Sequence, residues 1–167
     1  MECLQWLLEG GADARRVAAV GFFSEPEVEL SGDEVWGLEG QLISALAIGD
    51  AAEALDAAER LMAAGCYQEA QEAYAQLADS DVEERAVCLA QIGAARLALG
   101  RYAGALQSYA AARDEGADPN LIDDALWEVC EAWAGADPRQ RSAVLARYSA
   151  LCPQGRHLAG VAVAQSA

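Results

Sequence analysis

The stretch AVCLAQIGAARLALGRYAGALQSYAAARDEGADP, residues 86–119, decides the fold of this chain. Gly93 and Ala105 are small where two antiparallel helices must approach closely, and Tyr109 is large enough to fill the space beside them. Gly100 separates the two segments, because a left-handed glycine closes a helix C-terminus without a Cβ clash. The stretch therefore predicts a hairpin of two helices.

The same pattern occurs once more, 35 residues earlier in the chain. Self-similarity at a fixed period of this size is typical of helical repeat proteins. The earlier copy predicts helices over 51–64, capped by Asp50, and over 67–78. The residues that match at this offset are Gly65, Tyr67, Ala70 and Tyr74, which correspond to Gly100, Tyr102, Ala105 and Tyr109.

A fainter third copy follows the central stretch. Gly135 lies 35 residues beyond Gly100 and is expected to end a helix over 121–134. Pro138 is expected to open the second helix, which reaches Leu151. The tyrosines of the other copies are missing here, as suits a terminal repeat whose outer face meets water.

The central hairpin resembles the tetratricopeptide repeat (TPR), whose pattern reads W-x2-L-G-x2-Y, then A-x3-F, then P over about 34 residues. The resemblance covers residues 51–119 well and residues 120–152 poorly. It implies an all-α fold, a right-handed stack of about three TPR-like antiparallel helix hairpins with an N-terminal helical extension. The residues that carry it are Leu89, Ile92, Gly93, Gly100, Tyr102, Ala105, Tyr109 and Pro119.

We expect three parts along the chain: residues 1–37 with short helices and an acidic loop, residues 38–152 as the TPR-like domain, and residues 153–167 as a tail. Glycines 10, 11 and 21 end two short helix candidates, Glu2–Glu9 and Ala12–Val20.

The segment Phe22–Gly37 contains Pro26, Gly32 and five acidic residues, and we interpret it as an acidic connecting loop. Asp33 is expected to cap a helix from about Glu34 to Ile48.

Charge restricts the class of partner. The net charge of -16 disfavours nucleic acid, whose phosphates would be repelled. Residues 1–84 hold 19 acidic side chains and three arginines, so a basic segment of a partner is favoured there, the alternative being a solvated acidic face.

Cysteine usage and the first residues bear on location. The five cysteines form no CxxC pair and the chain has a single histidine, so neither a zinc site nor a disulfide framework is predicted. MECLQWLLEGG lacks a basic region before a long apolar run, so we predict no signal peptide, no membrane insertion and a cytoplasmic location.

Nothing in the motifs favours an enzyme. The chain contains no glycine-rich phosphate loop, nucleophile elbow or HExxH motif. Asp123 and Asp124 are adjacent, so they should point apart on a helix as solvated residues of its first turns. His157 falls in the predicted tail and is expected to be incidental. We predict no catalytic residue, no metal and no cofactor.

A binding role follows from the resemblance. In a TPR-like stack the first helix of each pair lines a concave groove, and aligning the glycines at 65, 100 and 135 selects its groove-facing residues. The set lacks the basic and amide side chains with which family members clamp a carboxylate, so it fits apolar anchors of a protein or peptide partner. The predicted partner-binding residues are Leu55, Glu59, Met62, Val87, Ala90, Ala94, Leu97, Ile122, Ala125, Val129 and Trp133.

Three alternatives stay open at this stage. The apolar face is core or is covered by the N-terminal helices, or it joins two copies as a homodimer in a structural subunit of a bacterial assembly. The segment GAARLALGRYAGALQSYAAA, with the size and acidity of the chain, is also similar to the small TPR chaperones that hold translocator proteins in bacterial type III secretion.

Overall fold

The structure is a computed structural model that describes residues 30–80 and 85–165. These residues form helices and no strands, and no helix among them is long and apolar enough to cross a membrane. The predicted helices Glu2–Glu9 and Ala12–Val20 lie outside the described residues. The elements are α3 (Gly32–Ile48), α4 (Ala51–Ala63), α5 (Tyr67–Ser80), α6 (Arg85–Ala98), α7 (Tyr102–Asp114), α8 (Pro119–Ala136), the 3-10 turn η1 (Pro138–Gln140), α9 (Arg141–Leu151) and α10 (Leu158–Gln165).

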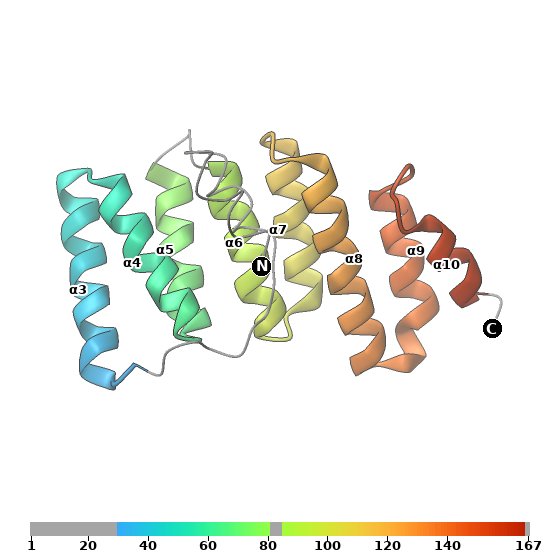
Figure 1. The fold of residues 1–167 in the computed structure, drawn as a ribbon, viewed down its shortest axis with the longest axis horizontal. Helices are drawn as coiled ribbons and strands as arrows, with labels where there is room; N and C mark the ends of the chain where they lie inside the picture. The colour runs from blue at the N-terminus through green and yellow to red at the C-terminus, as the bar shows by residue number, and fades with distance from the viewer. Residues whose placement is uncertain (1–29, 81–84, 166–167) are drawn as a thin grey trace, which may run out of the picture.

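The helices follow one another in a row, each packed mainly on its neighbours in the sequence (Figure 1). The most extensive contacts are between α6 and α7, the predicted central hairpin, and between α5 and α6. The helix α3 also touches α5. The predicted all-α fold built from neighbouring helix pairs is therefore confirmed.

Four glycines make the tight turns of this row. The backbone φ angles of Gly49, Gly65, Gly100 and Gly116 lie between 68° and 95°, the left-handed region that glycine enters without strain. At Gly100 the amide donates to the Leu97 carbonyl over 2.9 Å, and the amide of Arg101 donates to the Arg96 carbonyl over 2.7 Å. This pair of bonds is the Schellman motif, and it confirms the predicted helix end.

The residues that match at an offset of 35 occupy equivalent structural positions. Tyr67 and Tyr102 are the first residues of α5 and α7. Tyr74 and Tyr109 are both fully buried. A Cβ added at Gly93 would lie 3.0 Å from ring atoms of Tyr109, so the close approach expected between α6 and α7 is present.

The third pair ends its first helix differently from the prediction. The helix α8 continues through Gly135, which is absent from the left-handed glycines of the described residues. The stop comes instead from Pro138, which disfavours helical geometry in the residue before it. Asp137 then accepts a hydrogen bond from the amide of Arg139 over 3.1 Å and starts η1 before α9.

The helix α3 begins earlier than predicted. Ser31, not Asp33, is its N-cap: the Ser31 hydroxyl accepts from the Glu34 amide, and the Glu34 carboxylate accepts from the Ser31 amide over 2.8 Å. This reciprocal pair is a capping box. Residues 32–37, which the predicted acidic loop included, are therefore helical, and the helix predicted from about Glu34 to Ile48 is confirmed with an earlier start.

Buried side chains form two apolar clusters. The first joins α3 to α6 and includes Leu61 and Tyr74, and the second joins α6 to α10 and includes Tyr109 and Leu126. The helix α6 therefore contributes buried side chains to both clusters. Both Met62 and Leu89 are partly buried and pack against both clusters. The core therefore runs along the row, and α6 links its two clusters.

Candidate partner-binding site

Most of the predicted partner-binding residues lie inside the core. Eight of the eleven are buried: Leu55 belongs to the first apolar cluster, and the other seven belong to the second. Their exposed fractions are 7% or less, so these side chains offer little surface to another molecule. The buried members are Leu55, Val87, Ala90, Ala94, Leu97, Ile122, Ala125 and Val129.

The remaining three, Glu59, Met62 and Trp133, are half-buried. Met62 packs at the link between the two clusters, and Trp133 packs at the edge of the second. The structure thus does not bring the predicted set together on one accessible face. Of its apolar members, Met62 and Trp133 are the ones that retain accessible surface.

Trp133 is held by aromatic and cationic neighbours from the helices on either side of α8 in the sequence. Its ring stacks on Tyr102 of α7, with centroids 6.0 Å apart and planes 18° from parallel. The Arg147 guanidinium of α9 lies 5.1 Å from the centre of the indole, a cation–π contact. Tyr102, Trp133 and Arg147 therefore connect three consecutive helices.

An open hollow of about 370 Å³ adjoins this aromatic stack. A hollow beside two half-buried aromatic rings suits a single apolar or aromatic side chain of a partner. The prediction missed Tyr102 and Arg101, because it considered only first helices of the pairs. The hollow is lined by Gly100, Arg101, Tyr102, Ala103, Gly104 and Trp133.

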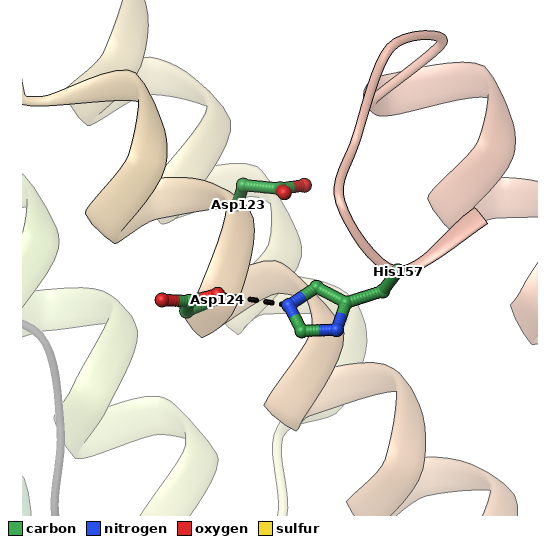
Figure 2. Close-up of side chains that lie close together, drawn as sticks. All are labelled: Asp123, Asp124 and His157. Carbon is green, nitrogen blue, oxygen red and sulfur yellow. Dashed lines mark hydrogen bonds and ion pairs between the residues drawn. The ribbon is translucent and has the colours of Figure 1, made fainter. Parts of the chain in front are cut away.

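A second group of polar side chains lies where the chain after α9 returns to α8 (Figure 2). Asp123 is buried, and its Oδ1 accepts a 2.6 Å hydrogen bond from the Tyr148 hydroxyl. Its Oδ2 accepts a 2.8 Å bond from the amide of Arg156. The expectation that Asp123 is solvated is therefore wrong, because the returning chain covers it.

Asp124 and His157 meet beside Asp123. The His157 Nε2 lies 2.8 Å from Asp124 Oδ1, and the Arg156 guanidinium donates to Asp124 Oδ2. The imidazole stacks on Trp127, with centroids 5.1 Å apart and planes 5° from parallel. His157, expected to be incidental, thus helps to hold the segment that leads into α10.

Hydrogen bonding decides the charge of Asp123. Burial raises its pKa, but hydrogen bonds from Tyr148, from the Arg156 amide and from Cys152, together with the electrostatic effect of His157, lower it, and the net pKa lies below the ordinary value. Burial and the same carboxylate raise the pKa of the Tyr148 hydroxyl well above its usual range. Asp123 is therefore an ionised acceptor at neutral pH, not a proton donor.

Asp123, Asp124 and His157 also have the spacing of metal ligands, since their ligand atoms lie within 4.8 Å of one another. Each carboxylate oxygen already has a partner in Tyr148, Arg156 or His157. Because Arg156 supplies the positive charge, a cation would have to displace it. The group therefore fits a structural link between α8 and the returning chain better than a metal centre. We call these residues the clamp: Asp123, Asp124, Tyr148, Arg156 and His157.

Comparisons with protein-family models, with curated proteins and with solved structures found no match to this chain.

Proposed function

We propose that this protein is a non-enzymatic adaptor or chaperone that holds a segment of a partner protein on a right-handed, TPR-like stack of helix hairpins. It would act in the cytoplasm and without a cofactor. The repeat of Gly65, Tyr67 and Tyr74 as Gly100, Tyr102 and Tyr109 in equivalent positions supports the hairpin stack. Stacks of this kind commonly act through extended binding surfaces.

The observation that carries the proposal is the hollow beside Tyr102 and Trp133. Both rings are half-buried, so an entering side chain would displace water from an apolar surface that is already fixed in place. Burial of one large apolar anchor contributes roughly 1.5 to 3 kcal/mol. Tryptophan, tyrosine and arginine are also the residues that most often dominate binding energy at interfaces.

The buried members of the predicted set have a different role in this proposal. Val87, Leu97 and Val129 lie in the same cluster that packs beneath Tyr102 and Trp133. They would keep the hollow in shape without touching the partner. The acidic first half, with 19 acids against three arginines, would orient a basic flank of the bound segment.

The test uses Ala103, an exposed residue that lines the hollow, with Ala150 on α9 as the matched control. Wild type, Ala103→Glu and Ala150→Glu would each be used to capture partners from lysate of the source organism. The segment bound by wild type is then titrated calorimetrically against all three proteins. We expect Ala103→Glu to raise the Kd of the segment at least about tenfold and Ala150→Glu to leave the Kd unchanged.

Two results would contradict the adaptor. If no segment is captured, or if Ala103→Glu binds as well as wild type, the hollow is not the binding site. Light scattering on the same samples addresses the competing structural role. A wild-type dimer that Ala103→Glu converts to a monomer would show that this face joins two copies.

A further inference from the structure

The helix α3 is apolar on two separate faces. Leu38 and Leu42 point into the first apolar cluster and are 3% and 6% exposed. Trp36 and Ile43 are 79% and 66% exposed. At 100° per residue, the Trp36–Ile43 side lies about 130° around the helix from the Leu38–Leu42 side. We call the exposed residues Trp36, Gly40, Ile43 and Ala47 the outer face of α3.

Nothing in the described part of the chain covers this outer face. The helix α3 is the first in the row, and its contacts are with α4 and α5 (Figure 1). Together with Ile48, Trp36 and Ile43 are the large apolar side chains that stand exposed among the described residues. An amphipathic surface helix needs only one apolar face, so a second one indicates an interaction surface.

The charges beside the outer face restrict its occupant. Asp33 and Glu39 lie on either side of it by helical position, and α3 contains no lysine or arginine. A second copy of this chain would bring the same acidic flanks to the contact, and like charges would repel. An occupant with apolar residues and arginine fits better.

The sequence directly before α3 has this composition. Residues 2–23 contain Trp6, Leu7, Val17, Val20 and Phe22 among their apolar side chains. They also contain two of the three arginines of the first 84 residues, the adjacent pair Arg15 and Arg16, together with three acids, Glu2, Glu9 and Asp13. Only Asp13 stands within five residues of the arginine pair, so the positive charge that would face α3 is local to that pair.

The connection also has sufficient reach. Ten residues separate Val20 from Ser31, the N-cap of α3, and ten extended residues span about 33 Å. The helix α3 has 17 residues and is about 25 Å long, so the preceding segment can turn back along its full length.

We propose that residues 2–23 of the same chain pack on the outer face of α3 and so cover the free end of the helix row. Their apolar residues contact Trp36 and Ile43, and their arginines approach Asp33 and Glu39. Terminal repeats of helical stacks need such a cover, because the end helix otherwise leaves apolar surface in water. This inference does not depend on the hollow at Trp133.

The test is hydrogen exchange of the full chain, read by mass spectrometry over peptides from residues 2–23. We expect protected amides there in wild type. Ile43→Glu should speed their exchange at least about tenfold, because it removes one large apolar contact and adds an acid. Ala150→Glu, on an exposed position of α9, is the matched control and should leave it unchanged.

A second variant changes the other side of the contact. Arg15→Glu combined with Arg16→Glu should also speed exchange over residues 2–23, while α6 to α9 keep their protection. The proposal is overturned if residues 2–23 are unprotected in wild type or if their protection survives both variants. A wild-type dimer that Ile43→Glu converts to a monomer would assign the outer face to a second copy and equally overturn it.

Discussion

Gly155 shows how closely the chain after α9 is fitted to its neighbours. A Cβ there would clash with the Tyr148 hydroxyl and lie 2.7 Å from Asp123 Oδ1. We therefore expect Gly155→Ala to lower the free energy of unfolding by about 1–3 kcal/mol, measured by urea denaturation. Gly135→Ala is the control: it meets open space in α8 and should raise stability by about 0.5–1 kcal/mol. If Gly155→Ala and Gly135→Ala changed the free energy of unfolding equally, the clamp would not be tightly packed around Gly155.

The clamp should also make stability depend on pH through Asp123. Its folded-state pKa lies below the ordinary 3.8, so its contribution is present above that value and is lost as pH falls through the folded-state pKa. We expect Asp123→Asn to cost about 1–3 kcal/mol at pH 7, with the difference from wild type shrinking below about pH 4.

Asp124→Asn provides the comparison for this pH effect. The Asp124 side chain is 46% exposed, so its pairs with Arg156 and His157 should contribute no more than about 1 kcal/mol at any pH. Urea unfolding of the three proteins between pH 3 and pH 7 measures both differences. A constant effect of Asp123→Asn across this range would show that its charge is not what the clamp uses.

The residues that sequence predicted correctly act over short distances along the chain. Gly100 and Gly93 were predictable, because a helix end and a close helix–helix contact each demand a particular residue type. Asp123 was not, since its partners Tyr148 and Arg156 lie 25 and 33 residues away and no local pattern joins them. From sequence alone, a charged aspartate is expected to face water, not to accept a hydrogen bond from a buried tyrosine hydroxyl.

At the scale of elements, the pairing of α6 with α7 depends on the ring of Tyr109. The ring lies against Gly93, and its hydroxyl has no hydrogen-bond partner among the described residues. We expect Tyr109→Ala to cost about 3–5 kcal/mol in thermal unfolding, and Tyr109→Phe to leave stability unchanged or raise it by about 1 kcal/mol. A large loss in Tyr109→Phe would show that the hydroxyl contributes.

Helix limits were predictable wherever a glycine ends a helix, and less so elsewhere. At α8 the glycine pattern gave Gly135 as the stop, whereas Pro138 and Asp137 provide it. At α3 the capping box of Ser31 and Glu34 sets the start. In both cases two possible helix boundaries lay within a few residues of each other. The prediction chose Gly135 over Pro138 as the end of α8 and Asp33 over Ser31 as the cap of α3.

The candidate site was harder to predict than the helices. An apolar stripe such as Val87, Ala90 and Leu97 has the same periodicity whether it lines a groove or packs in a core. The structure buries these three residues and leaves Trp133 half-exposed. The hollow depends on how α7 approaches α8, which is a tertiary arrangement that hydrophobic spacing does not encode.

At the scale of the whole molecule, the two apolar clusters should differ in how they respond to mutation. Leu61 is fully buried in the first cluster and Leu126 in the second. We expect Leu61→Ala to speed hydrogen exchange mainly in α3 to α5, and Leu126→Ala mainly in α7 to α9, each at a cost of about 2–5 kcal/mol. Uniform loss of protection in either variant would show one cooperative unit instead.

Packing between sequence neighbours has a mechanical consequence. The extensive contacts of each described helix are with the helices beside it in the chain, and none of them joins α3 to α10. A pulling force applied to these two helices would therefore not have to break a contact between the two ends of the row first. Under a low force the hairpins would unfold one after another, and they would refold in the same small steps when the force is released.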